Sequence, residues 1–136
     1  SCGRGTDKQF QVYGHPDLDK AVKSFTFTPQ PNEGSKHPKH VGKICNGVDF
    51  TALDSKKYVK RNLELSYILD AYNSFDHSKS DFFNTNNLFE KLAGNTELRN
   101  QITQKKSEQE IRASWEPALS QYKMLRKKYL LYPDFK

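Results

Sequence analysis

The sequence predicts an α+β fold: a small, mostly antiparallel sheet covered by three or four helices, with a long helix at the C-terminal end. Short segments in which polar and apolar side chains alternate all lie before residue 54. Helical periodicity starts near residue 61 and continues almost to the last residue. Strands followed by helices, with no alternating βα rhythm and no internal repeat, favour a single α+β domain over residues 1–136.

Three segments are predicted as strands, namely one through Phe10 and Val12, one over residues 24–28 and one within residues 42–53. The second is rich in aromatic and β-branched residues, which fit a half-buried pleated surface. The Gly14-His15-Pro16 sequence is predicted to end the first strand. Within the third segment, Asn46-Gly47 is predicted to form a bulge or a turn between two short strands.

The segment Gln30–His40 is predicted to be a long loop, because it consists largely of Pro, Asn, Gly, Ser, Lys and His. Loops of this length inside a domain tend to be functional or disordered. His15, His37 and His40 do not have the spacing of metal ligands on a helix, and no carboxylate pattern accompanies them. We therefore expect no metal site, and nothing in the sequence indicates a cofactor.

Helical spacing of apolar residues predicts a first long helix over residues 61–75. A following apolar cluster leads into Gly94, which is predicted to lie just past the end of a second helix. Asn95 or Thr96 is predicted to cap a short third helix that carries Leu98 and Ile102.

The last helix is predicted over residues 107–132, and it is the strongest signal in the chain. Ser107 with Glu110 predicts a capping box at its start, and Pro117 predicts a kink or a short break. Six apolar residues at steps of three and four form one stripe, which we expect to be core: Ile111, Trp115, Ala118, Tyr122, Leu125 and Tyr129. The Leu130-Leu131-Tyr132 tail is expected to end packed.

The chain has 136 residues and a net charge of +6, but its basic residues are mostly scattered among acidic ones. Without a basic stripe and interleaved aromatics, we do not expect nucleic-acid binding.

No apolar run approaches the ~18 residues that span a bilayer, so no transmembrane segment is expected. Cys2 and Cys45 fit either one disulfide or two free thiols. The chain starts without methionine or signal peptide, and we expect it to be a mature or excised piece of a longer protein.

The first residues contain a glycine-flanked arginine, Gly3-Arg4-Gly5-Thr6. Glycines let the backbone adopt positive φ and let a ligand approach, and an arginine held there presents a planar fork that suits a carboxylate. The alternative is a flexible chain end without a function. These four residues are the candidate binding site. No two carboxylates are held together by spacing, so Asp7, Asp17, Glu33 and Asp49 receive no catalytic assignment.

The chain resembles the C-terminal part of the NamZ-type exo-β-N-acetylmuramidases, which are peptidoglycan glycosidases. Four stretches carry the resemblance, in chain order: Gly3-Arg4-Gly5-Thr6 with Phe10 and Gly14-x-Pro16; Phe25-x-Phe27-x-Pro29 with Gly42-x-x-Cys45-x-Gly47-Val48; Phe89-x-x-Leu92-Ala93-Gly94 with Leu98-Arg99; and Glu110-Ile111 to Ser114-Trp115 with Tyr129-Leu130-Leu131-Tyr132. Each stretch is weak alone, but together they run over nearly the whole chain.

The resemblance implies an extracytoplasmic bacterial enzyme, periplasmic or secreted and with or without a lipid anchor on its missing N-terminal part. Such an enzyme releases N-acetylmuramic acid from non-reducing ends of peptidoglycan, as in cell-wall recycling. This chain would be its C-terminal auxiliary domain, with an N-terminal α/β domain carrying the catalytic carboxylate and both parts bordering the cleft. The lactyl carboxylate of the muramyl glycan gives Arg4 a ligand, and the isolated chain should be inactive.

The alternative hypothesis is a non-catalytic module that binds cell-wall glycan or a partner protein. Five aromatic residues could stack on sugars in such a module: Tyr13, Phe25, Phe27, Tyr58 and Trp115. Most of them are also expected to be core, so the sequence leaves the two hypotheses open.

Overall fold

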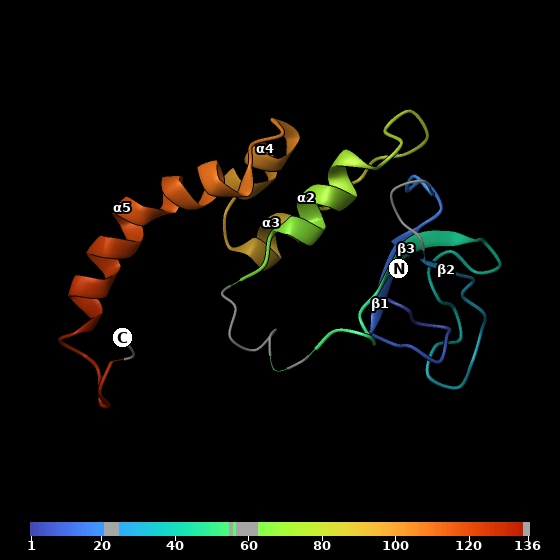
Figure 1. Ribbon diagram of the computed structural model, residues 1–136, viewed down its shortest axis with the longest axis horizontal. Helices are drawn as coiled ribbons and strands as arrows, with labels where there is room; N and C mark the ends of the chain where they lie inside the picture. Colours follow the sequence, from blue (N-terminus) through green and yellow to red (C-terminus); the bar gives the residue numbers. More distant parts are fainter. Residues whose placement is uncertain (21–24, 55, 57–62, 135–136) are drawn as a thin grey trace. The chain divides into compact units, whose positions relative to one another are not determined.

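A computed structural model describes residues 1–20, 25–54, 56 and 63–134 of the chain. These residues form two compact units, one over Ser1–Leu88 and one over Phe89–Lys136. The strands lie in the first unit, and Figure 1 shows the last three helices following one another in the second. A small antiparallel sheet and four described helices, of which the last is long and C-terminal, confirm the predicted α+β class. None of the described helices is both long and apolar enough to cross a membrane.

The sheet has three antiparallel strands in the order β1-β3-β2, with β1 over Val12–His15, β2 over Phe25–Phe27 and β3 over Cys45–Asp49. The central strand is therefore the last in sequence, and both partners pair with it. The predicted strand over residues 24–28 is confirmed at Phe25–Phe27, while residue 24 lies outside the described residues.

Two glycines that were predicted to interrupt the strands instead lie inside them, paired with each other across the sheet. Gly14 of β1 lies opposite Gly47 of β3, so the predicted break and the predicted bulge or turn are both wrong. A Cβ on Gly47 would lie 1.8 Å from the carbonyl oxygen of Tyr13, and one on Gly14 would lie 2.7 Å from the Phe27 ring. These glycines are needed for close approach of two strands rather than for a turn.

Among the described residues of the first unit, the helix α2 covers Ser66–Asn73. It is shorter than predicted, since residues 63–65 are not helical and residues 61–62 lie outside the described part. Its buried face, with the segment after it, contributes Ala71 and Phe75, which pack on Leu18. Backbone hydrogen bonds fix this contact: the Asp19 N–H donates to the Ser74 carbonyl at 2.9 Å, and the Asp76 N–H donates to the Asp17 carbonyl at 2.8 Å. The core of this unit is therefore tied to a loop by main-chain bonds.

The second unit begins with two short helices, α3 over Leu88–Ala93 and α4 over Glu97–Thr103. Gly94 follows α3 with φ +76° and donates its N–H to Glu90, as predicted for a residue past a helix end. Of the two predicted caps, Thr96 occupies the N-cap position of α4 but makes no side-chain capping bond, whereas the side-chain oxygen of Asn95 accepts the Leu98 N–H at 3.1 Å. An ion pair between Arg99 and Glu90 joins α3 to α4.

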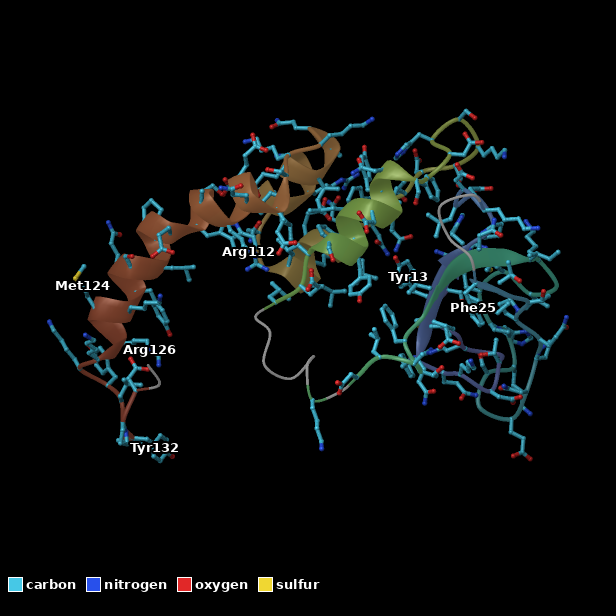
Figure 2. All side chains as sticks on the ribbon, viewed as in Figure 1. Tyr13, Phe25, Arg112, Met124, Arg126 and Tyr132 are labelled. Carbon is cyan, nitrogen blue, oxygen red and sulfur yellow. The ribbon has the colours of Figure 1, made fainter. Side chains whose placement is uncertain are left out.

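The last helix, α5, covers Glu108–Arg126 and has the predicted capping box, in which Ser107 and Glu110 exchange hydrogen bonds. The helix is continuous through Pro117, and in Figure 1 its ribbon changes direction part-way along, so the predicted kink rather than a break describes it. It ends at Arg126, before the predicted end at Tyr132. The side chains of Met124 and Tyr132 project away from the ribbon (Figure 2).

The apolar stripe of α5 is not core along its length, contrary to the prediction. Ile111 is fully buried and Trp115 is half-buried, but the remaining members, Ala118, Tyr122, Leu125 and Tyr129, are exposed. The tail over Leu130, Leu131 and Tyr132, which was expected to pack, is exposed as well. Periodicity correctly indicates an amphipathic helix, but it does not indicate which body covers the apolar face.

Candidate functional site

The glycine-flanked arginine forms a tight turn whose backbone requires glycine. Gly3 and Gly5 are buried and have φ values of +80° and +81°, which side chains rarely adopt. A Cβ on Gly3 would lie 2.4 Å from the Lys8 carbonyl oxygen, and one on Gly5 would lie 2.6 Å from both the Gln30 carbonyl oxygen and the Pro38 ring. The turn is therefore packed on both sides, and only the residue between the glycines faces outward.

Thr6 closes this turn with its own side chain. Its hydroxyl donates to the Gly3 carbonyl at 2.7 Å and accepts the Lys8 N–H at 3.0 Å, while its N–H donates to the same Gly3 carbonyl at 3.1 Å. The hydroxyl is thus committed to the turn, and Thr6 supports the site rather than pointing into it. These hydrogen bonds and the packing around Gly3 and Gly5 define the turn, while the binding role of the four residues stays a prediction.

Arg4 is the exposed residue at the tip of the turn, and its guanidinium lies over the ring of Phe10, 5.4 Å from the ring centroid. Arg4 makes no ion pair with any of the residues that the structure describes. A guanidinium that rests on an aromatic face keeps its hydrogen-bonding edge open, and this edge can accept a carboxylate in the two-pronged geometry that arginine favours.

Phe10 is a candidate site residue that the sequence analysis missed. It was predicted to lie in a strand with Val12, but it precedes β1, has φ +60° and is 68% exposed. Its N–H donates to the Cys2 carbonyl at 2.8 Å, which holds the backbone in this left-handed conformation. A bulky residue in that conformation is strained by about 1–3 kcal/mol, and such strain clusters at functional positions. Only a pattern of aromatic residues beside glycine turns could have indicated it.

The long loop over Gln30–His40 is attached to this turn. The Gln30 N–H donates to the Gly5 carbonyl at 2.8 Å, and Pro38 packs against Gly5. At the end of the loop, His40 has φ +65° and contacts His15 edge to face, with 4.4 Å between the ring centroids. Burial first, and then the neighbouring His15, lower the pKa of His40 to about 4, so both rings remain neutral near pH 7.

Two of the acidic residues that received no catalytic assignment, Asp49 and Asp17, have partners within the fold. Lys8 pairs with Asp49, and hydrogen bonds from Lys8 and then from Thr51 lower the pKa of Asp49 to about 2. Asp17 accepts a hydrogen bond from Ser80 at 2.6 Å. Each described carboxyl group with a shifted pKa is shifted downward, which is the opposite of what a general acid requires. Within the described residues, no group of three or more His, Cys, Asp or Glu side chains gathers as a metal site would require.

A hollow of about 550 Å³ in the first unit is lined partly by Asp17, Asn46 and Asp76. The Asn46 side chain donates to the Leu18 carbonyl at 2.8 Å, and Asp76 pairs with Lys79 at 2.9 Å. Because these polar groups already have partners within the fold, we assign no ligand to the hollow.

The structure also bears on the two cysteines and on the aromatic residues that were considered for sugar stacking. Cys45 is buried in β3, Cys2 is exposed, and both are free thiols. Tyr13 packs against Phe50 and Tyr67 rather than offering a face for a sugar, whereas Tyr58 lies outside the described residues.

The family match covers nearly the whole chain and does not depend on the Gly3–Thr6 turn alone. Residues 1–132 match the family described as "Exo-beta-N-acetylmuramidase NamZ, C-terminal". The chain belongs to this family. The NamZ C-terminal resemblance seen in the sequence is thereby confirmed, and its motif glycines acquire physical reasons, with Gly3 and Gly5 shaping the turn and Gly14 and Gly47 allowing β1 to approach β3.

Two relatives show how much of a NamZ-type protein this chain represents. Peptidoglycan beta-N-acetylmuramidase NamZ of Bacillus subtilis strain 168 is 32% identical over 147 residues, which cover 97% of this chain and 34% of the relative. A crystal structure of a DUF1343 family protein from Bacteroides fragilis superimposes with a TM-score of 0.82 and 38% identity, covering 99% of this chain and 37% of that protein. The chain therefore spans about a third of the length of each relative.

Proposed function

We propose that this chain is the C-terminal auxiliary domain of a peptidoglycan glycoside hydrolase that releases N-acetylmuramic acid from non-reducing ends. Its part would be to supply a cationic wall of the substrate cleft through the Gly3–Thr6 turn. The proposal carries with it an N-terminal catalytic domain in the same polypeptide and an extracytoplasmic location, periplasmic or secreted. Membership of the NamZ C-terminal family supports the proposal.

The cleft assignment depends mainly on Arg4, which is exposed at the tip of a hydrogen-bonded turn. N-acetylmuramic acid differs from N-acetylglucosamine by a lactyl carboxylate, so selection requires a fixed cation. Arg4 is exposed, lacks a carboxylate partner among the described residues and lies on the exposed ring of Phe10. The ring face opposite the guanidinium can stack on the apolar face of a sugar while the guanidinium binds the carboxylate.

None of the resolved pKa shifts of the described carboxyl groups suits a catalytic acid, which supports a catalytic role for a second domain. Glycoside cleavage requires a carboxylic acid that stays protonated against the leaving oxygen, which calls for a raised pKa. Among the described carboxyl groups, the resolved shifts are downward and come from ion pairs or hydroxyl hydrogen bonds. The acid is therefore expected from the N-terminal domain, and residues 1–136 alone should not hydrolyse a muramyl glycoside.

The test is Arg4→Ala in the full-length enzyme, assayed on a chromogenic muramic acid glycoside. Loss of a charge-assisted contact of about 1.5–3 kcal/mol should lower kcat/KM by about 10- to 100-fold. Lys91→Ala, which removes one exposed positive charge from the second unit, should leave kcat/KM unchanged. If Arg4→Ala hydrolyses the substrate as well as the parent enzyme, Arg4 does not bind the carboxylate.

Phe10→Leu separates the two parts of the proposed contact. Loss of the ring should weaken inhibition by muramyl and N-acetylglucosaminyl ligands alike, because both present a sugar face. Arg4→Ala should weaken only the muramyl ligand. A glycan-binding module without catalysis would instead bind muramyl disaccharide tightly as the isolated chain, which a titration followed by amide chemical shifts would reveal.

A further inference from the structure

The apolar stripe of α5 is buried at one end and open at the other. Ile111 has 0% exposure, whereas Tyr122 and Leu125 on the same stripe are 59% and 54% exposed. Tyr129, which follows the end of the helix, is 74% exposed. The start of the helix is held against α4, where the Gln101 side chain donates to the Ser114 hydroxyl at 2.9 Å. The apolar contact that begins at Ile111 thus continues along the helix onto a surface that the second unit leaves exposed.

The exposed part of the stripe is continuous with the chain that follows the helix. Leu131 is 87% exposed and Tyr132 is 77% exposed, so the apolar surface extends past the end of α5 at Arg126. Exposed apolar side chains gathered in one segment are typical of interfaces, because monomeric proteins seldom leave large apolar patches in water. Tyrosine is also enriched at interfaces, because it combines apolar area with a hydroxyl that hydrogen-bonds at the rim.

The charges beside the exposed part of the stripe are mainly positive. From Pro117 to Tyr132 the sequence has four basic residues, Lys123, Arg126, Lys127 and Lys128, and no acidic residue. Arg126 pairs with Asp134 just beyond this segment, so the three lysines carry the excess positive charge. Two copies of this surface would repel each other, so a symmetric dimer through the stripe is disfavoured. A complementary partner is apolar at its centre and acidic at its rim. A membrane surface fits less well, because the stripe is narrow and starts inside the protein at Ile111.

We propose that the exposed stripe of α5 and its tail dock against the N-terminal part of the same polypeptide, which is absent from this structure. Both relatives are about three times as long as this chain, and the matching family is a C-terminal one. The docked surface consists of Tyr122, Leu125, Tyr129, Leu131 and Tyr132. The inference rests on the N-terminal domain in the proposed function and adds the surface that holds the two together.

The test is photo-crosslinking in the full-length protein, with a benzophenone amino acid in place of Tyr122 or, separately, of Leu125. Ser120 is the matched control, because it is exposed on the same helix and lies about half a turn away from the stripe. Mass spectrometry of the digested protein should show crosslinks from positions 122 and 125 to peptides that precede residue 1. The same crosslinks should be lost at position 120.

Crosslinks from the stripe to residues 1–88, to a second copy or to lipid vesicles of anionic composition would overturn the proposal. The absence of any crosslink at both stripe positions would also overturn it. The readout does not depend on hydrolysis. If Arg4→Ala leaves kcat/KM unchanged while the crosslinks form, the binding assignment fails and the docking surface stands.

Discussion

The Gly3–Thr6 turn and the second half of α5 both face solvent, but the chain holds them in different ways. The turn is fixed by hydrogen bonds within the first eleven residues and by the loop at Gln30 and Pro38, and it exposes one polar side chain. The helix is fixed by its own capping box and by Ile111, and it exposes an apolar stripe. A rigid polar tip suits a small anionic ligand, whereas an apolar stripe suits a protein surface.

The largest expected effect compares the two ends of the α5 stripe. Ile111→Ala removes a fully buried side chain and should lower the free energy of unfolding by about 2–5 kcal/mol. Leu125→Ala removes a side chain of similar size that is half exposed, and in residues 1–136 it should cost less than about 1 kcal/mol. Urea unfolding of both variants measures the difference. Equal losses would mean that the stripe is already covered in this chain.

The next effect compares glycines of the two units that share a backbone conformation. Gly5 has φ +81° beside packed neighbours, and Gly94 has φ +76° with nothing within 4 Å of an added Cβ. Both alanine variants incur the left-handed strain of about 1 kcal/mol, but Gly5→Ala must also displace the Gln30 carbonyl and Pro38. We expect Gly5→Ala to lower the midpoint of thermal unfolding clearly more than Gly94→Ala. Similar midpoints would show that the Gln30 carbonyl and Pro38 can move aside for a methyl group at little cost.

Sequence reasoning succeeded where the cause of a structure lies within a few residues. The capping box at Ser107 and Glu110, the helix end at Gly94 and the strand at Phe25–Phe27 are local features, and all three are confirmed. It failed at Gly14 and Gly47, because the need for glycine there arises from a strand more than thirty residues away. Residue propensity predicts that glycine allows a turn, but it does not predict that a neighbouring strand leaves no room for a side chain.

The same limit explains the candidate site and the stripe. The sequence could single out Gly3, Gly5 and Arg4 as candidates, because glycine permits a positive φ and arginine binds carboxylates. It could not show the packing on Gly5, because the residues that contact Gly5 are Gln30 and Pro38 of a distant loop. Phe10 was misassigned because alternation with Val12 resembles a strand, whereas its left-handed backbone depends on a bond to the Cys2 carbonyl. For α5, a 3.6-residue period identifies an apolar face but cannot identify the body that covers it.

The smallest expected effect concerns the charges that support the turn. Hydrogen bonds from Lys8 and Thr51 lower the pKa of Asp49 to about 2 from its ordinary value of 3.8. Because the folded pKa lies below the unfolded one, ionised Asp49 stabilises the fold above about pH 4, and this contribution is lost as the pH falls toward 2. Asp49→Asn should therefore lower the free energy of unfolding slightly near neutral pH, and the difference from the parent chain should shrink as the pH approaches 2.

Glu110 provides the counterpart of Asp49 in the second unit, since hydrogen bonds from Ser107 hold its pKa below the ordinary 4.5. Glu110→Gln should also lose its effect in acid, but it should destabilise α5 without altering the turn. Urea unfolding across this pH range, with the amide shift of Arg4 as a local probe, measures both variants. Asp49→Asn should move the Arg4 amide shift and Glu110→Gln should not, because Asp49 reaches the turn through Lys8 whereas Glu110 acts on the cap of α5. If both variants moved that shift equally, the turn and the helix would not be independently held, and the contrast between the two surfaces would fail.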